Sequence, residues 1–401
     1  MRSASRLIPA IPLIAGLLLT TGGAAIAASP VAPAFTITAD DAAAVPAGHK
    51  WAFNDYFPRS ATVAQGTTIA FAAQGFHTAT LLPTSWTPAQ DLDVSGLVAA
   101  DIDDTSLNVN GTTKLSENVL GVLPVPAQGC GTAATPCVFD GTAIVSMGAP
   151  LAPGPAAPFI VTITAAPGTY AFHCRIHAGM SGTLTVVAAD SKVAVTTDAS
   201  AQAAATTQAA DDVTAGLAAE TAADAAAVKT NKDGTKTWTV AAGASDPSGH
   251  VTMLDMIPRQ LDIKPGDTVL WKPLAVNEPH TITFPGELHS DSIAKCEGTG
   301  GKDTPAIPTK NPPASPFDFA CSGHPADEIE FGGGNGVAKV TTPTTVSDSG
   351  IIAAPSVVRA FDVPASGTLP SWTVSFTGAA KGTYHYVCQI HAGMEGTVVV
   401  H

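Results

Sequence analysis

The amino-acid sequence predicts an all-β protein built from two tandem β-sandwich domains. The chain has 401 residues, which is too long for one ordinary sandwich and sufficient for two. Charged residues make up 13% and aromatic residues 6% of the chain, while glycine (37 residues) and proline (32 residues) are abundant. This composition favours short strands joined by many turns over a helical bundle. A long internal repeat favours two domains over one.

The N-terminus has the features of a secretory signal peptide. Two arginines, Arg2 and Arg6, precede an apolar stretch over residues 7–19, and residues 25–27 (Ala-Ile-Ala) form a small-x-small cleavage site. The alternative, a membrane anchor, is disfavoured because the apolar run is short and is interrupted by two prolines. We therefore expect residues 1–27 to be removed and the mature chain to be secreted or extracytoplasmic, without a transmembrane anchor.

The second half of the chain repeats the first. Residues 168–183 (GTYAFHCRIHAGMSGT) recur as residues 382–397 (GTYHYVCQIHAGMEGT) at an offset of 214. Further upstream, Phe57-Pro58-Arg59 recurs as Ile257-Pro258-Arg259 at an offset of 200. Because the offset changes along the chain, we expect loop insertions between shared strands. Alternating polar and apolar residues, as in Thr183-Leu184-Thr185-Val186, are typical of half-buried strands.

These matches place the first domain at residues 34–189 and the second at residues 234–401. The stretch between them, residues 190–233, is rich in Ala, Thr, Asp and Gln and is predicted to be a linker. As a flexible coil, it would span about 35–40 Å. Its alanines could equally form a helix, with residues 209–228 as the best stretch, and the sequence does not decide between the two.

Each repeat contains Cys-x-x-His-x-x-Met preceded by a distant histidine. The first set is His77, Cys174, His177 and Met180, and the second set is His280, Cys388, His391 and Met394. One thiolate and two imidazoles with a weakly bound thioether suit copper in both of its oxidation states. Zinc would accept the cysteine and histidines, but a thioether is not among its usual ligands.

A single motif of this kind could be an ordinary buried turn. Two copies in matching strand contexts, each with an upstream histidine followed by threonine, favour a copper site in each domain. The alternative is a duplicated structural sandwich whose sites have decayed. Neither copy has lost a ligand, which argues against that alternative.

Strand alternation predicts what surrounds each motif. Tyr170 and Phe172 fall on the same face as Cys174 and are expected in the core beneath the metal. His173 and His385 point to the opposite face, so we expect them to be surface residues rather than ligands.

Both repeats resemble the cupredoxins of the plastocyanin, amicyanin and azurin family, and the short Cys-x-x-His-x-x-Met loop is closest to that of amicyanin. The resemblance implies an eight-stranded Greek-key sandwich with one type 1 blue copper per domain and single-electron transfer as the activity. It also implies equatorial ligation by each cysteine with its two histidines, and axial ligation by Met180 and Met394.

The sequence departs from the family pattern in two ways. Thr78 and Thr281 stand where many relatives have an asparagine that ties the ligand loops together, although a hydroxyl could still hydrogen-bond across. The connection from the first histidine to the cysteine is also long, with 96 residues in one unit and 107 in the other. These insertions could shield the copper or form a docking surface.

The remaining cysteines, Cys130, Cys137, Cys296 and Cys321, lie in the insertions. In an oxidising compartment they favour disulfides, and four cysteines allow three pairings. The repeat favours one bridge per domain, Cys130–Cys137 and Cys296–Cys321, over a second metal site. His289 and His324 lie near acidic residues in the second insertion, where a solvated polar loop is favoured over another metal site.

The charge of the chain constrains its partners. The net charge is −14, and loss of the signal peptide with its two arginines would bring it to about −16. Such a surface would repel nucleic acid. We expect a redox partner protein with a basic docking patch.

Three functions remain open, with electron transfer favoured. Two cupredoxin units also build copper enzymes, but those commonly carry His-x-His pairs, and none of the eleven histidines here forms one. Storage or delivery of copper is the other alternative. Delivery sites are usually exposed and rich in Met or Cys, which are scarce in this chain.

Overall fold

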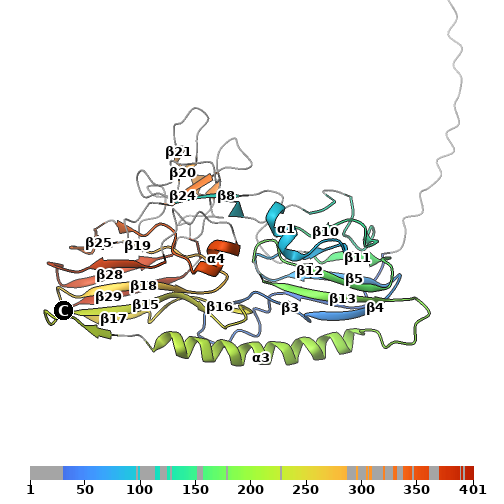
Figure 1. Cartoon of the computed structure of the whole chain (residues 1–401), viewed down its shortest axis with the longest axis horizontal. Coiled ribbons are helices and arrows are strands. Elements are labelled where there is room, and N and C mark those ends of the chain that lie inside the picture. Colours follow the sequence, from blue (N-terminus) through green and yellow to red (C-terminus); the bar gives the residue numbers. More distant parts are fainter. Residues whose placement is uncertain are drawn as a thin grey trace, which may run out of the picture.

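Two β-sandwiches lie end to end in the computed structural model, and one long helix runs along the same side of both (Figure 1). The structure describes residues 30–95, 124–126, 129–150, 157–177, 179–225, 228–286, 337–345, 347–360, 370–388, 390–391 and 393–401, together with short strands of the insertions. The predicted signal peptide, His289 and His324 lie outside the described residues.

The first sandwich contains two five-stranded sheets. One has the order β3 (Tyr56–Phe57), β1 (Thr36–Ala39), β5 (Thr68–Ala73), β11 (Phe159–Ile163) and β9 (Cys137–Phe139). The other has the order β10 (Val145–Ser146), β6 (Thr80–Leu81), β12 (Gly168–His173), β13 (Ser181–Val187) and β4 (Ser60–Ala64). Alternate residues of β4 and β13 are buried, as expected for strands with one face on the core.

The second sandwich repeats this plan. One sheet has the order β2 (Trp51–Phe53), β16 (Val251–Ile257), β15 (Lys236–Ser245), β18 (Thr268–Leu274), β27 (Trp372–Ser375) and β25 (Val337–Lys339), with β14 (Val228–Thr230) beside β15. The other has the order β17 (Gln260–Ile263), β29 (Glu395–Val400), β28 (Gly382–Val387), β19 (Thr283–Phe284) and β26 (Ser347–Asp348). The parallel pair β13–β4 recurs as β29–β17, so the sequence repeat is also a structural repeat. The predicted all-β class with two sandwiches is confirmed.

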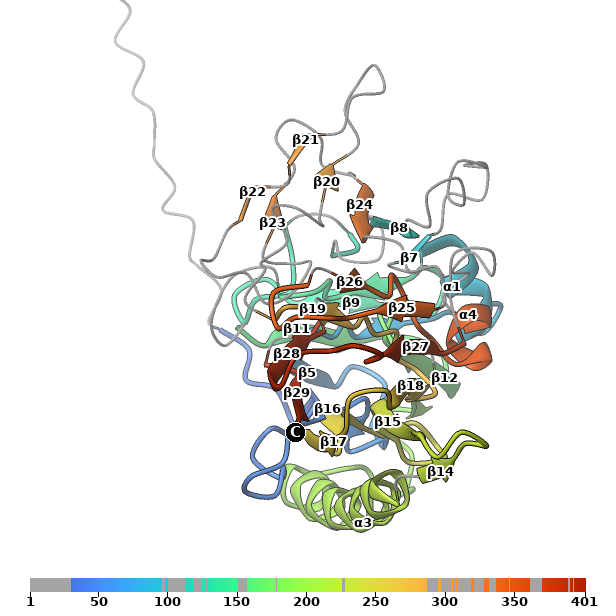
Figure 2. The same ribbon diagram turned by 90° about the vertical axis from the view of Figure 1, so that its left-hand side faces the viewer.

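Short strands of the two insertions form further sheets on the side of the sandwiches opposite the long helix (Figure 2). The larger sheet has the order β21 (Thr304–Pro305), β20 (Lys295–Cys296), β24 (Glu328–Phe331), β8 (Thr113–Glu117) and β7 (Val98–Ala99). A pair of two-residue strands, β22 (Ile307–Pro308) and β23 (Phe319–Ala320), lies beside it. Because β24 pairs with β8, the insertion of one half joins that of the other.

The predicted linker contains an α-helix rather than a flexible coil. Helix α3 (Asp198–Asp224) begins with a capping box, in which Thr197 and Ser200 exchange hydrogen bonds between side chain and backbone. Its 27 residues extend about 40 Å. The helix packs on β1 and β3 of the first sandwich and on β15 and β16 of the second. The high helix propensity of alanine and the buried positions along one side explain this outcome.

A strand from the first half completes a sheet of the second. Strand β2 pairs antiparallel with β16, with Phe53 opposite Val251. Its apolar residues join a buried cluster at the junction of the two sandwiches, made of Trp51, Phe53, Phe57, Ala209, Ala223, Ala241, Ala244, Val251, Met253 and Ile257. The two halves therefore share a sheet and a core at their junction.

An ion-pair network lies at the same junction. Arg59 pairs with Asp55 of its own half through a 2.8 Å hydrogen bond. Its Nη2 also lies 3.0 Å from Asp212 of α3 and 3.0 Å from Nδ1 of His250 in the second half. The donor atoms of Asp55, Asp212 and His250 lie close enough together to hold a cation. The guanidinium of Arg59 already contacts all three residues. We interpret the cluster as a structural network.

Two smaller features complete the fold. Cys130 and Cys137 form the predicted disulfide, while the predicted pairing of Cys296 with Cys321 lies outside the residues whose side chains are described. Helices α1 (Pro88–Ser95) and α4 (Pro355–Ala360) are short. Within the described residues, no helix combines the length and the apolar character needed to span a bilayer.

The contact of α3 with the junction gives a testable expectation. A Cβ added at Gly216 would lie 2.9 Å from the Trp51 ring and 3.0 Å from Val251. We expect Gly216→Leu to lower the free energy of unfolding by about 1–3 kcal/mol through overpacking. Ala218→Leu, on the exposed side of the same helix, should change it by no more than about 0.5 kcal/mol. If urea titrations show the same change in the free energy of unfolding for both variants, the packing of Gly216 against Trp51 and Val251 is contradicted.

Candidate metal centres

The first candidate centre brings together His77, Cys174 and His177. One donor atom from each of the three residues lies within 4.8 Å of the others, and all three residues are buried. The sulfur of Cys174 is 3.7 Å from Nδ1 of His177. Nδ1 of His77 is buried without a hydrogen-bond partner among the described residues. A buried imidazole nitrogen left unpaired beside a thiol fits a metal ligand.

The second candidate centre repeats this geometry with His280, Cys388 and His391. Their donor atoms also lie within 4.8 Å of one another. Nδ1 of His280 is 3.2 Å from Nδ1 of His391, and Nδ1 of His391 is 3.7 Å from the sulfur of Cys388. The same three donor types therefore converge in both halves.

A tight return loop between two strands positions the cysteine, the second histidine and the methionine. In the first half, the Cys174 amide donates to the Met180 carbonyl at 3.0 Å, and the Met180 amide donates to the His177 carbonyl at 3.1 Å. Gly179, with a φ of 92°, allows the reversal. The second loop has the corresponding bonds from Cys388 to Met394 at 2.8 Å and from Met394 to His391 at 3.2 Å.

Each predicted axial methionine lies in the same buried core as its cysteine. Met180 belongs to the core of the first sandwich together with Cys174, and Met394 belongs to the core of the second together with Cys388. Tyr170 and Phe172 are buried in the core of the first sandwich, as predicted, and Tyr386, two residues before Cys388, is buried in the second.

Each thiol is surrounded by groups that favour its ionised form. The Thr78 amide points at the Cys174 sulfur at 3.3 Å, and the Thr281 amide points at the Cys388 sulfur at 3.4 Å. Burial raises the pKa of each thiol, but the neighbouring histidines outweigh burial and hold both pKa values well below the usual range. The sites are therefore built for a thiolate.

The threonine that replaces the family asparagine still connects the two ligand loops. The Thr78 hydroxyl accepts a 2.8 Å hydrogen bond from the Arg175 amide, next to Cys174. This bond joins the loop of the remote histidine to the cysteine loop, so the threonine hydroxyl does hydrogen-bond across.

Taken together, the donor set fits a copper ion. Each centre offers one thiolate, two imidazoles and a buried thioether in the same core, which is a mixture of soft and borderline donors. The structure thus brings the cysteine and both histidines of each predicted set together, with the methionine in the same core.

Glu278 lies between the two centres, and sequence reasoning did not single it out. Its Oε1 is 3.0 Å from Nε2 of His177 in the first half. Its Oε2 is 3.3 Å from Nε2 of His391 in the second half. Burial opposes ionisation of Glu278, but the two histidines outweigh burial and hold its pKa well below the usual range. In the sequence, the one feature that could have pointed to Glu278 as part of the site is its position two residues before His280.

The contacts with Glu278 and with the cysteines also shift the pKa values of His177 and His391. Burial lowers the pKa of His177, but the carboxylate of Glu278 and the Cys174 sulfur outweigh it and raise the pKa to about 10. Burial likewise lowers the pKa of His391, while Cys388 and Glu278 raise it to about 9. A metal at Nδ1 would replace the proton there, and the hydrogen on Nε2 would stay on the ring and be donated to Glu278.

The remote histidines have different surroundings in the two halves. Nε2 of His77 is 3.9 Å from a carboxylate oxygen of Asp40. Nε2 of His280 is buried with no hydrogen-bond partner among the described residues. Gly243 lies so close to it that an added Cβ would be 2.1 Å from that nitrogen.

The prediction that His173 lies on the surface is wrong. The residue is only 1% exposed, and its Nε2 is 2.8 Å from Asp91 of α1. Asp91 also accepts hydrogen bonds from Nε and Nη2 of Arg175 at 2.7 and 2.8 Å. Strand alternation does direct His173 away from the core, but the insertion places α1 over that face. His385, in contrast, is exposed as predicted.

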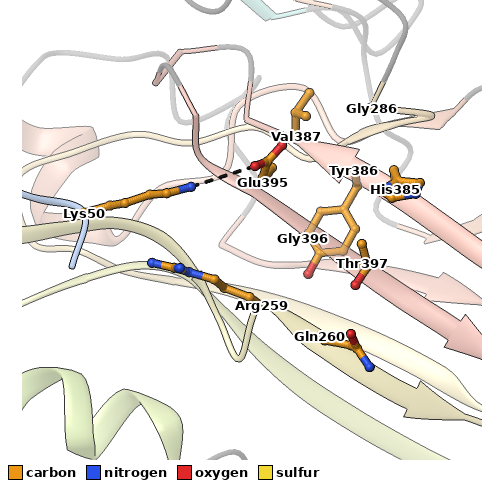
Figure 3. Close-up of a pocket in the computed structure, with 10 residues that line it drawn as sticks. All are labelled: Lys50, Arg259, Gln260, Gly286, His385, Tyr386, Val387, Glu395, Gly396 and Thr397. Atoms are coloured by element: carbon orange, nitrogen blue, oxygen red, sulfur yellow. Dashed lines mark ion pairs between the residues drawn. The ribbon is translucent and has the colours of Figure 1, made fainter. Parts of the chain in front are cut away.

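A surface groove of about 460 Å³ lies beside the return loop of the second centre (Figure 3). Lys50 of the first half reaches along it, donates to the Gly393 carbonyl and lies 3.9 Å from Glu395. The groove is lined by Lys50, Arg259, Gln260, Gly286, His385, Tyr386, Val387, Glu395, Gly396 and Thr397. Through Lys50, the first half contacts the ligand loop of the second.

Solved structures similar to this chain include small blue copper proteins and a copper-containing nitrite reductase. Reduced auracyanin from Roseiflexus castenholzii is 19% identical, with 39% of this chain and 98% of auracyanin covered and a TM-score of 0.20. A fern plastocyanin is 18% identical, with 38% and 99% covered and a TM-score of 0.17. The copper-containing nitrite reductase of Thermus scotoductus is 12% identical, with 85% and 59% covered and a TM-score of 0.17.

No protein-family model matches the chain, and no curated protein matches it. At the identities and TM-scores given above, the similar structures carry no argument about activity. The donor sets and their surroundings carry the functional argument.

The buried cluster of Asp91, His173 and Arg175 should make stability depend on acid. His173 and Arg175 overcome the cost of burial and lower the pKa of Asp91 from 3.8 to about 2. Because the folded-state pKa lies below the ordinary value, the carboxylate stabilises the fold above pH 4 by about 2 kcal/mol. This contribution should be lost as the pH falls from about 5 towards 2, measured by urea unfolding of the metal-free protein.

Two variants test the assignment to Asp91. Asp91→Asn should lower the free energy of unfolding by about 3–5 kcal/mol near pH 7, because it removes the buried carboxylate that pairs with His173 and Arg175. This loss should become smaller at low pH. Asp190→Asn removes an exposed carboxylate and should keep the wild-type pH profile. If Asp91→Asn lowers the free energy of unfolding by the same amount at pH 6 and at pH 2.5, this role for Asp91 is ruled out.

Proposed function

We propose that the chain is a two-domain copper protein that carries single electrons through one type 1 centre in each half. The observation that supports this most strongly is the convergence of a buried thiol and two imidazoles within 4.8 Å, found once in each sandwich. The proposed ligands are His77, Cys174, His177 and Met180 in the first half, and His280, Cys388, His391 and Met394 in the second.

A copper ion bound by such a set supplies one-electron chemistry by alternating between Cu(I) and Cu(II). The protein has to hold the donors in place during that change. Backbone hydrogen bonds close each return loop, and the apolar cores pack around each cysteine. Ligands fixed in this way need little rearrangement when the charge of the site changes.

The burial of the donors favours electron transfer over copper delivery. Cys174 is 0% and Cys388 is 3% exposed, and both remote histidines are buried. A delivery site has to present its ligands to an acceptor protein, whereas an electron can leave through a buried ligand. Retention of both metals in the presence of a Cu(I) chelator would agree with electron transfer, and rapid loss would favour delivery.

A copper enzyme would need a further metal site for its substrate. The other cluster of potential ligands in the described part of the chain is Asp55, Asp212 and His250, and Arg59 occupies it. We therefore keep electron transfer as the proposed function. The net charge of −14 suits a partner with a basic docking patch, and we propose an extracytoplasmic location from the N-terminal sequence.

Substitution of the cysteines tests the proposed ligands. The copper-loaded protein should bind two coppers per chain and show the intense visible absorption of a thiolate bound to copper. Cys174→Ser and Cys388→Ser should each remove about half of this absorption, and the double variant should remove all of it.

The disulfide cysteines provide a control for the loss of sulfur elsewhere. The paired change Cys130→Ser and Cys137→Ser should keep the visible absorption, because that bridge lies outside both donor sets. Colour that persists in the Cys174→Ser, Cys388→Ser double variant would sink the ligand assignment.

The close approach of Gly243 to His280 permits a selective test of the second centre. Gly243→Ala would push a methyl group onto Nε2 of His280, so we expect the second copper to be lost while the first is retained. Gly234→Ala is a matched control, since Gly234 has a similar positive φ of 86° but nothing within 4 Å of an added Cβ. Two bound coppers per Gly243→Ala chain, by elemental analysis and spin resonance, would contradict the role of His280.

A further inference from the structure

A single carboxylate contacts a proposed ligand of each metal centre. Glu278 lies 3.0 Å from Nε2 of His177 through one oxygen and 3.3 Å from Nε2 of His391 through the other. In both rings, Nδ1 is the nitrogen that faces the cysteine sulfur, at 3.7 Å. Each ring therefore points Nδ1 at its own centre and Nε2 at Glu278.

The hydrogen-bonding capacity of the three groups matches this arrangement. A neutral imidazole that binds a metal through Nδ1 carries its hydrogen on Nε2 and donates it to an acceptor. An ionised carboxylate is an acceptor with two oxygens, so it can serve one imidazole with each. With both metals bound, His177 and His391 would each donate one hydrogen bond to Glu278.

The surroundings hold the carboxylate in this position and keep water away. Glu278 is 7% exposed. Its Oε1 is 3.4 Å from the side-chain amide of Asn54, which comes from the first half. Asn54 is itself 3.1 Å from the Thr252 hydroxyl, which donates to Asn277 at 2.9 Å. The bridge therefore depends on residues from both halves.

We propose that Glu278 couples the two copper centres, so that they act as a relay pair rather than as two independent carriers. This proposal rests on the proposed function, because it assumes copper at both sites. The connection from one centre to the other consists of two imidazole rings, one carboxylate and two hydrogen bonds. Within the described residues, no other side chain contacts both donor sets.

The relay step is balanced in electrons and protons. An external one-electron donor reduces the metal at one centre, and the electron then moves to the oxidised metal at the other. The first metal loses one electron and the second gains one. Both Nε2 hydrogens stay on their rings, with Glu278 as acceptor before and after the step, so no proton has to leave the buried site.

Removing the charge of Glu278 should affect both centres at once. A shared negative charge stabilises the more positive, oxidised state of each copper. Glu278→Gln should therefore raise both reduction potentials and favour the reduced state of each by about tenfold or more, which is 59 mV for a one-electron couple. The potentials are measured in the full chain, and each is assigned with the single-site variants Cys174→Ser and Cys388→Ser.

Glu220→Gln is the matched control for a change of charge at the junction. Glu220 is a half-buried carboxylate whose Oε2 lies 2.6 Å from Nδ1 of His49, outside both donor sets. This variant should leave both potentials unchanged. A shift of only one potential in Glu278→Gln, or equal shifts in Glu220→Gln, would overturn the proposal.

A second readout tests the bridge directly. In the Cu(I) protein, nitrogen-15 NMR should detect Nε2 hydrogens of both His177 and His391 that exchange slowly with water. Glu278→Asp keeps the charge but is one methylene shorter, so it should expose at least one of these hydrogens to rapid exchange. If Glu278→Gln does not fold, this variant still decides the question, because slow exchange of both hydrogens in Glu278→Asp would contradict the bridge.

The outcomes separate the two proposals. If the wild-type chain binds no copper with a thiolate absorption band, the proposed function fails. If it binds two coppers but fails the tests of Glu278, the proposed function stands and the coupling is rejected.

Discussion

The burial of three donor groups around one point is the constraint on which both halves depend. A buried imidazole nitrogen without a partner and a buried thiolate are each costly in an apolar interior. Among the described residues, Nδ1 of His77 has no hydrogen-bond partner, and the Cys174 sulfur accepts a hydrogen bond from the Thr78 amide. A cation at this point would compensate both groups.

The junction between the sandwiches imposes a second constraint. The halves share a sheet through β2 and a core through α3, and Arg59 links Asp55, Asp212 and His250 across the boundary. Asn54, which contacts Glu278, follows β2 directly in the chain. The same short segment therefore fixes the relative position of the halves and supports the carboxylate between the centres. A flexible linker could not hold His177 and His391 on one carboxylate.

The sequence was sufficient to predict the fold class and the local part of each site. A repeated Cys-x-x-His-x-x-Met loop is a short-range pattern, and its geometry follows from one turn between two strands. The distant histidines could be inferred because they recur in matching contexts. Three other features depend on packing between residues far apart in the sequence, which no local pattern encodes. They are the helix of the insertion that covers His173, the pairing of β2 with a sheet of the other half, and the position of Glu278. Glu278 has no counterpart in the first half at the same place before His77, so the repeat could not reveal it.

The two centres have equivalent donors but different surroundings, which bears on what a duplicated site can do. Asp40 adopts a φ of 65°, and its Oδ1 accepts hydrogen bonds from the amides of Asp41 and Phe53, while its other oxygen faces His77. In the second half, Nε2 of His280 faces Gly243 and has no hydrogen-bond partner among the residues that the structure describes.

This difference changes the charge near each metal position. Burial lowers the pKa of His280, whereas Asp40 and Cys174 outweigh burial and raise the pKa of His77. The carboxylate near His77 would favour the more positive state of a metal held there, whereas within the described residues no carboxylate oxygen lies within 4.0 Å of a ring nitrogen of His280. Glu278 lies 3.0 Å from His177 and 3.3 Å from His391, and its charge also acts on His280. With copper at both sites, as proposed, the unequal surroundings would give the two centres different reduction potentials. An electron would then have a preferred direction between them, which it would not have between two identical sites.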